Sequence, residues 1–372
     1  KTKDHVIRRE LRTVPGEKFS RQDIIRSQRE LANLQYFNQE TIDPGVVPNP
    51  ENGTVDINWK LDEKSSDQLE MSAGWGGGVG LTGTLGVTFN NFSIRNITKR
   101  SSWDPLPTGD GQKLSLRIQS NGKAYQSYSF AFTEPWLGGK KRNSFTINVN
   151  KSVFRNGYYN PINGKYEFSD TTLLKTFGAG ISLGKQLKWP DDYFSLIYAV
   201  NYTQYKLKDY QFQGFGFSNG TSNNVSLRLG LQRSSVYDPT FPKSGSSFIA
   251  SVQATPPYSL LDPGIVKSQN PYKNPEYHKW KFNAEWFLPI GRAHGADEAS
   301  KRQLVLKVAA KYGFMGRYNK KLDFSPFERF QLGGDGLSGY SFFIGRDIIS
   351  QRGYRVYAQN ATIFNKYTAE LR

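Results

Sequence analysis

The chain has 372 residues, enough for one large domain and a small one, and it lacks cysteine, which excludes disulfides, thiolate metal sites and cysteine nucleophiles. Mean hydropathy is −0.60 and no stretch approaches 18 consecutive apolar residues, so the sequence excludes a transmembrane helix but not strands that alternate polar and apolar residues. The formal net charge of +17 comes from cations scattered over turns and strand ends, with no basic helix or stacking module, so we expect no nucleic-acid partner.

Residues 1–65 carry a mixed pattern that predicts a small α+β module. Val6, Ile7 and Leu11 suggest a short first strand. Ser20 precedes a helical stretch and can cap it, with Asp23 three residues later as the reciprocal acid. Along one side of this predicted helix, at helical spacing, lie Ile24, Ile25, Gln28, Leu31 and Leu34.

A turn and an amphipathic strand complete the module. The turn is predicted from Pro44, Pro48, Pro50 and Asn52-Gly53. After it, the alternating apolar residues are Val55, Ile57, Trp59 and Leu61. The predicted order is therefore strand, helix, strand, strand.

From residue 66 onward the sequence shows a succession of long alternating segments and no convincing helix. In the segment 225–232, for example, leucines and Val225 face away from Ser226, Arg228 and Gln232. The predicted strands are twelve: 67–77, 81–91, 112–120, 124–136, 145–150, 173–187, 194–202, 225–232, 246–255, 280–288, 304–314 and 362–372.

The alternation is open to two interpretations, a soluble β-sandwich or a membrane-spanning β-barrel. Many segments are ten residues or longer, and a tilted strand needs roughly 9–11 residues to cross a bilayer. The second face carries charged and amide side chains in mid-strand, which suits a wet lumen, and aromatic residues gather near strand ends. These features favour the barrel.

Two glycine-rich stretches, Gly78–Gly83 and Gly334–Gly339, match the pattern G-x-G-x-x-G of dinucleotide sites. That motif requires a helix after the glycines, but a period of two follows the first stretch and no helical stripe follows the second. The histidines stand alone, and no acid–histidine cluster has metal spacing. We expect no cofactor, no metal and no enzymatic activity.

Several motifs resemble the BamA family of outer-membrane β-barrel assembly proteins. KTKDHVIRRELRTVPGEKFSRQDIIRSQRELANLQYF resembles the last POTRA domain of that family, and VDINWKLDEKSSDQLEMSAGWGG resembles the passage into the first barrel strand. YQSYSFAFTEPWLGG is similar to an early strand and its turn, and FERFQLGGDGLSGY followed by QRGY is similar to the long inward loop. The resemblance implies a POTRA-like periplasmic domain over 1–65 and a transmembrane β-barrel over 66–372.

The resemblance further implies sixteen barrel strands, with the long loop between the eleventh and twelfth. The loop spans 319–361 after eleven predicted strands, so four strands are expected beyond Arg372. The family hallmark V-R-G-F aligns with Arg352-Gly353-Tyr354, although Gln351 replaces the valine and an insertion separates the hallmark from Gly333-Gly334. These five residues are the expected anchor of the loop, with Tyr354 packed against the wall and the carboxylate partner of Arg352 beyond Arg372.

The family also makes the first barrel strand one side of a lateral gate. Glycine weakens a strand and permits bending, so a glycine-rich seam could let an incoming strand pair with the edge. The expected gate residues are Leu69, Met71, Ala73, Gly74, Trp75 and Gly76. A tight hairpin that needs glycine for steric reasons alone is the alternative.

The implied function is folding and insertion of other β-barrel proteins into the bacterial outer membrane, without nucleotide. The implied partners are unfolded outer-membrane clients, accessory lipoproteins of the assembly complex, and outer-membrane lipids including lipopolysaccharide. Two alternatives stay open: a related POTRA-barrel transporter that secretes a partner polypeptide, and a passive outer-membrane channel. A POTRA module argues against the channel, because a channel needs no periplasmic docking domain.

Overall fold

A computed structural model describes residues 2–76, 80–103, 106–210, 218–236, 241–267, 270, 272–294, 302–334, 347–351, 353–354 and 360–372. The chain divides into two compact units, Lys1–Val149 and Asn150–Arg372. In the first unit, the N-terminal module contains α1 (Asp4–Arg8), α2 (Arg21–Asn33), the 3-10 turn η1 (Gln39–Thr41), β1 (Asp43–Asn49) and β2 (Thr54–Lys60). The α+β prediction is confirmed, but the order is helix, helix, strand, strand.

Two details of the module correct the prediction. Val6 belongs to a five-residue helix and not to a strand, because a single turn is too short to show its period in the sequence. Pro44 and Pro48 lie within β1, which pairs only with β2 in the described part of the chain. An edge strand tolerates proline because its outer backbone groups need no partner.

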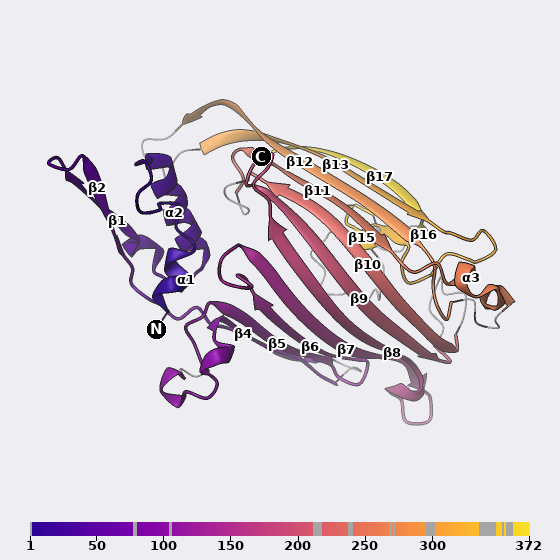
Figure 1. Ribbon diagram of the computed structural model, residues 1–372. Coiled ribbons are helices and arrows are strands. Elements are labelled where there is room, and N and C mark those ends of the chain that lie inside the picture. The colour runs from indigo at the N-terminus through magenta and orange to yellow at the C-terminus, as the bar shows by residue number, and fades with distance from the viewer. Residues whose placement is uncertain are drawn as a thin grey trace. The chain divides into compact units, whose positions relative to one another are not determined.

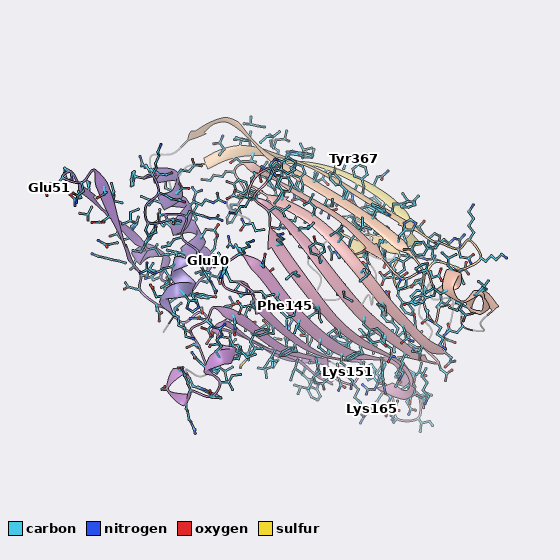
Figure 2. All side chains as sticks on the ribbon, viewed as in Figure 1. Glu10, Glu51, Phe145, Lys151, Lys165 and Tyr367 are labelled. Carbon is cyan, nitrogen blue, oxygen red and sulfur yellow. The ribbon has the colours of Figure 1, made fainter. Side chains whose placement is uncertain are left out.

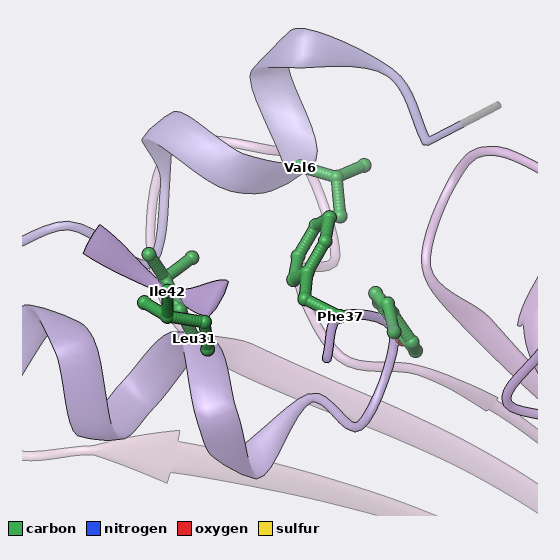
Figure 3. Packing of buried hydrophobic residues seen from close by; sticks show 5 residues of the cluster. Val6, Leu31, Phe37 and Ile42 are labelled. Carbon is green, nitrogen blue, oxygen red and sulfur yellow. The ribbon is translucent and has the colours of Figure 1, made fainter. Parts of the chain in front are cut away.

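The core of the module is a cluster in which Val6, Leu31, Phe37 and Ile42 are buried together with Tyr36 (Figure 3). Helix α2 begins as predicted, because the Ser20 hydroxyl accepts a hydrogen bond of 3.2 Å from the backbone N–H of Asp23. Ile24 and Leu31 are buried on its inner side, whereas Ile25 is exposed, so the predicted apolar stripe is one residue too wide.

The remaining long strands form one antiparallel sheet of twelve, in chain order from β3 to β13 and with β17 next to β13 (Figure 1). The predicted number of strands is confirmed. Their bounds are β3 (Gln68–Gly76), β4 (Gly80–Phe92), β5 (Gln112–Asn121), β6 (Tyr125–Glu134), β7 (Asn143–Asn160), β8 (Lys165–Gln186), β9 (Phe194–Lys208), β10 (Gly220–Ser234), β11 (Gly245–Ala254), β12 (His278–His294), β13 (Arg302–Gly316) and β17 (Ile363–Leu371).

Strands β7 and β8 are much longer than predicted, with 18 and 22 residues. At the ends where β7 leads into β8, polar residues occur on both faces of the strands, as in KYEFSDTT at the start of β8. Backbone hydrogen bonds do not depend on side-chain alternation, so a strand can continue where the pattern in the sequence has stopped.

The sheet exposes its apolar face and buries polar side chains on the other face, the reverse of a soluble protein. In β10, Leu227 and Leu229 are exposed, whereas Ser222, Asn224 and Ser226 are buried on the opposite face. A soluble sandwich would bury the leucines. Exposed apolar residues opposite a polar face are the arrangement of a membrane barrel, in which lipid covers the outside.

Short elements occupy the connections. They are η2 (Ile94–Asn96) and η3 (Arg100–Ser102) between β4 and β5, α3 (Tyr258–Leu261) and η4 (Pro263–Lys267) between β11 and β12, and the small sheet of β14 (Phe330–Leu332), β15 (Asp347–Ile349) and β16 (Asn360–Ala361) between β13 and β17. The prediction of no helix after residue 66 missed these short turns. No helix among the described residues is long and apolar enough to cross a membrane.

Candidate functional site

The predicted gate residues lie on β3, the terminal strand of the sheet. In the described part of the chain, β3 pairs with β4 only, so its other backbone edge has no strand neighbour. Leu69, Met71, Ala73 and Trp75 share the apolar face, and Trp75 is 80% exposed. An unpaired edge carries free N–H and C=O groups, which a further strand can bind.

Gly74 and its neighbours sit where β3 and β4 approach closely. A Cβ on Gly83 of β4 would lie 2.6 Å from the carbonyl oxygen of Ser72, so this position admits glycine only without a backbone shift. A Cβ on Gly74 would meet only the hydroxyl of Thr82, at 3.1 Å. The steric explanation therefore applies to Gly83, and much less to Gly74. Of the gate set, Gly76 ends β3, and the glycines at 77 and 78 lie outside the described residues.

An ion pair on the polar face fastens β3 to the sheet. A guanidinium nitrogen of Arg117 in β5 lies 2.9 Å from a carboxylate oxygen of Glu70 in β3. The pair passes over Gly86 of β4, where an added Cβ would lie 3.2 Å from the Glu70 carboxylate. Both side chains are about half exposed, so the pair contributes less than about 1 kcal/mol to the attachment of β3.

The loop between β13 and β17 brings together two motifs that are far apart in the sequence. The N–H of Gly334 donates to the carbonyl of Tyr354 at 2.8 Å, and the N–H of Gln351 donates to the carbonyl of Gly334 at 2.8 Å. The N–H of Gly333 donates to the carbonyl of Ile349 at 2.9 Å. The double glycine and the hallmark turn therefore form one hydrogen-bonded unit.

Glycine is required at three points of this unit. Gly333, Gly334 and Gly353 have φ values of 136°, 82° and 84°, in the left-handed region that side chains disfavour. Arg352, the predicted anchor, lies outside the described residues. Tyr354 is 60% exposed, so its predicted packing against a wall is not found among the described residues.

A buried charged group, absent from the sequence prediction, attaches two segments of the loop to the strands. Lys279 of β12 is 2% exposed, and its ammonium nitrogen lies 2.5 Å from Asp347 and 3.3 Å from Glu328, both loop carboxylates. It also donates to the carbonyl of Glu328 at 2.6 Å. Asn224 of β10 donates to the second carboxylate oxygen of Glu328 at 2.7 Å. Lys281 adds a contact of 3.1 Å to Asp347.

Aromatic packing completes the attachment of the loop to the strands. Phe327 of the loop stacks on Tyr205 of β9 with ring centroids 4.1 Å apart. Phe330 packs edge-on against Phe364 of β17 at 4.8 Å. A Cβ on Gly313 of β13 would overlap both Phe330 and Phe364, so this glycine makes room for the loop.

The sequence offered a weak signal for this attachment. Lys279 and Lys281 belong to the polar face of β12, and a mid-strand lysine in a barrel must find an acid or water. Which carboxylate it would find could not be read from the sequence, because Glu328 and Asp347 are 49 and 66 residues or more away along the chain.

The N-terminal module contacts the turns of the first strands. Trp136, in the turn after β6, donates to the carboxylate of Glu10 at 2.7 Å (Glu10 is labelled in Figure 2). Arg142 of the same turn lies 3.3 Å from Glu10 and 2.9 Å from Glu30 of α2. Burial acts to raise the pKa of Glu30, but the hydrogen bond and charge of Arg142 outweigh it and lower that pKa.

A second group of contacts joins the module to the β4–β5 connection. Lys3 lies 2.6 Å from Asp110, and the Tyr36 hydroxyl donates to the carbonyl of Asn90 at 2.7 Å. Burial acts to raise the pKa of Asp110, but the hydrogen bonds from Lys3 and Ser93 outweigh it and lower that pKa. The module and this connection therefore lie at the same end of β4 and β5.

Within the described residues, no group of three or more His, Asp or Glu side chains could hold a metal ion. The candidate site thus consists of an open strand edge and an anchored loop. Its chemistry is hydrogen bonding and apolar burial.

Two family models match the chain. The Omp85 superfamily domain matches residues 108–372, and the POTRA model, described as a surface antigen variable number repeat, matches residues 1–64. The first match covers the sheet from β5 onward and the second covers the N-terminal module, and β3 and β4 lie between the two matches.

The chain is also similar to proteins described as outer-membrane protein assembly factors. The outer membrane protein assembly factor BamA of Neisseria meningitidis serogroup B is 24% identical over 96% of this chain. A putative outer membrane protein assembly factor of Treponema pallidum is 31% identical over 42% of it. The chain spans 40% of the Neisseria protein and 18% of the Treponema protein.

Two solved structures share the fold. BamA from Haemophilus ducreyi lacking POTRA domains 1-3 aligns with a TM-score of 0.50 and 19% identity, over 90% of this chain and 57% of that structure. CdiB from Escherichia coli aligns with a TM-score of 0.60 and 12% identity, over the whole of this chain and 59% of that structure.

Proposed function

Given that this chain belongs to the Omp85 superfamily, we propose that it folds and inserts β-barrel proteins into the bacterial outer membrane. The Omp85 match and the BamA relatives indicate that membrane. We further propose that residues 1–65 form the periplasmic POTRA-like domain and that the barrel begins at residue 66. The relatives named as assembly factors support this function, and no enzymatic step is part of it.

One observation carries the proposal: in the described part of the chain β3 ends the sheet, pairs with β4 alone and presents an exposed apolar face. A client strand that pairs with this edge would satisfy its own backbone groups at the lipid boundary. Burial of its apolar side chains in lipid would supply the free energy, so no nucleotide is needed. Leu69, Met71, Ala73, Gly74, Trp75 and Gly76 would form one side of this lateral gate.

The proposed partners follow from this mode of action. Unfolded outer-membrane proteins would be the clients, and accessory lipoproteins of an assembly complex would bind outside the gate. Lipids, including lipopolysaccharide, would contact the exposed apolar face. No cofactor is proposed.

Secretion of a partner polypeptide is the second candidate function, because a barrel domain with a POTRA module is also compatible with it. In a transporter, cargo would pass through the lumen and the gate would stay shut. A passive channel is a weaker candidate, because it has no use for a POTRA module.

A disulfide lock tests the gate. Met71→Cys, or Ala73→Cys, is paired with a cysteine in the last strand of the complete protein, in a background without other cysteines. The locked protein should stay folded in detergent but lose client insertion, and reduction should restore it. Secretion without insertion, or unchanged insertion in the locked protein, would refute the gate.

The matched control is the pair Leu85→Cys and Ile118→Cys, which are direct partners in the register of β4 and β5. These strands are already neighbours, so the control lock should leave insertion unchanged. Loss of insertion with both locks would attribute the effect to the disulfide and not to the seam.

We propose that Arg352 anchors the tip of the long loop through a bidentate carboxylate outside this chain, with Gly333, Gly334, Gly353 and Tyr354 shaping the turn. Lysine keeps the charge but loses the two-pronged geometry, so Arg352→Lys should lower heat stability and client assembly, the lost bond amounting to roughly 1.5–3 kcal/mol. The stretch Leu337-Ser338-Gly339-Tyr340, outside the described residues, is the competing candidate for the hallmark but has serine in place of the arginine, so Ser338→Ala should be nearly silent. The opposite ranking would place the anchor on the other turn of the loop.

A further inference from the structure

The first part of the connection between β4 and β5 buries two polar side chains and exposes three large apolar ones. Ser93 and Asn96 are buried, whereas Ile94, Ile97 and Trp103 are 52%, 48% and 43% exposed. Exposed apolar area is unfavourable in water, so a surface that covers these side chains would stabilise the connection.

The buried polar groups show that the arrangement is fixed. Ser93 donates to the carboxylate of Asp110, and the amide of Asn96 donates to the carbonyl of Thr108 at 2.9 Å. The N–H of Ile94 donates to the side chain of Gln112 at 2.7 Å. These bonds close the base of the connection, so its apolar side chains cannot turn inward without breaking them.

The exposed apolar residues continue the lipid-facing side of the sheet. Phe92, the last residue of β4, contacts Phe132 edge-on with centroids 6.4 Å apart. Phe132 lies on the same face of β6 as Tyr128 and Phe130, which are exposed and apolar. Ile94 follows two residues after Phe92, at the border of this apolar face.

The same segment is cationic. Arg95, Lys99 and Arg100 are exposed, and no acidic residue occurs between 93 and 103; Asp104 follows, outside the described residues. The indole N–H of Trp103 donates to the backbone carbonyl of Ile97 at 3.3 Å, which ties the ring to this turn. Tryptophan with nearby cations is the composition of a membrane–water interface.

We propose that Ile94, Arg95, Ile97, Lys99, Arg100 and Trp103 form an interfacial patch that binds anionic phospholipid head groups in the leaflet on the side of the N-terminal module. The module contacts the base of the same connection through Lys3 and Asp110. The patch would therefore hold the attachment point of the module at the bilayer surface. The inference requires strands that span a bilayer, but not the assembly activity.

The test uses the complete protein in lipid nanodiscs, with an environment-sensitive fluorophore on Ile97→Cys in a cysteine-free background. Glu51→Cys, at the exposed tip of the β1–β2 hairpin, is the control (Glu51 is labelled in Figure 2). Quenchers carried by phosphatidylglycerol should reduce the emission at residue 97 at least twofold more than at residue 51. A label at residue 97 that lipid quenchers do not reach would overturn the proposal.

The charge requirement is tested with Arg95→Gln, Lys99→Gln and Arg100→Gln combined, on the labelled protein. Quenching by phosphatidylglycerol should exceed quenching by phosphatidylcholine in the parent, and the excess should be lost in the triple variant. An equal response to the two lipids in the parent would overturn the anionic preference. Because client insertion is not measured, a failure here is separate from a failure of the proposed function.

Discussion

Lys279 is the point where two segments of the long loop meet the strands. Its ammonium group is shielded from water and bound to two carboxylates and a carbonyl. A buried ion pair adds little net stability when intact, but removal of one member leaves an uncompensated charge. We therefore assign Lys279 the role of positioning the loop, at a place distinct from Arg352 in the sequence.

Lys279→Met should destabilise the loop by about 3–5 kcal/mol, because the buried carboxylate of Glu328 would lose its cationic partner. Limited proteolysis of the loop and the unfolding temperature of the complete protein would show the loss. Faster cleavage within 319–361 is the expected result.

Lys281→Met is the matched control, two residues away on the same face of β12. Asp347 would keep its 2.5 Å contact with Lys279, and Lys281 is partly exposed, so the cost should stay below about 1 kcal/mol. Equal damage from the two variants would show that Lys279 has no special position.

Strand β3 combines a fixed register with weak attachment. Gly83 lets the backbones of β3 and β4 approach, and the exposed pair of Glu70 and Arg117 adds little. In the described part of the chain β3 is hydrogen-bonded along one edge only, and such a strand opens more easily than one paired on both sides. This combination suits a strand that must exchange partners while its register stays defined.

Gly83→Ala should loosen β3 by roughly 1–3 kcal/mol, because the new methyl group would meet the carbonyl of Ser72. Faster hydrogen exchange over residues 68–76 is the measurement. Gly230→Ala in β10 is the control, since its Cβ would have no neighbour closer than 3.8 Å. If hydrogen exchange over residues 68–76 were unaltered in Gly83→Ala, the backbones of β3 and β4 would accommodate the methyl group without loss of stability, and the prediction would be wrong.

At the scale of the whole molecule, the first unit couples the N-terminal module to the membrane-spanning strands through acidic groups. Asp110 and Glu30 both have a lowered pKa, so their contribution to docking is complete above their ordinary values of 3.8 and 4.5. As the pH falls through the lower pKa values of the folded state, the carboxylates become protonated and this contribution is lost.

Protease sensitivity of residues 1–64 should therefore be flat above about pH 4.5 and rise below about pH 4. Asp110→Asn should be more sensitive than the parent at neutral pH, with a weaker dependence on pH. Time courses with trypsin at neutral pH and pepsin at acidic pH, each normalised to cleavage of an unfolded peptide at the same pH, provide the measurement. A parent protein that is equally resistant from pH 7 to pH 3 would remove Asp110 and Glu30 from the docking.

The sequence by itself determined the architecture. Alternation of side chains revealed the twelve strands, because lipid on one face and water on the other impose a period of two. The cap at Ser20 and the apolar positions of α2 were also local and therefore readable. Short or unpatterned elements, such as α1 and the ends of β7 and β8, left no period to detect.

Only the tertiary structure decided which groups meet. The pairing of Lys279 with Glu328 and Asp347, and of Gly334 with Gln351, depends on where a long loop folds back. The exposure of Ile94 and Trp103 likewise depends on polar side chains that close the base of their connection. Contacts between distant segments follow from the path of the whole chain, whereas a local pattern records only the solvent on each side of a strand.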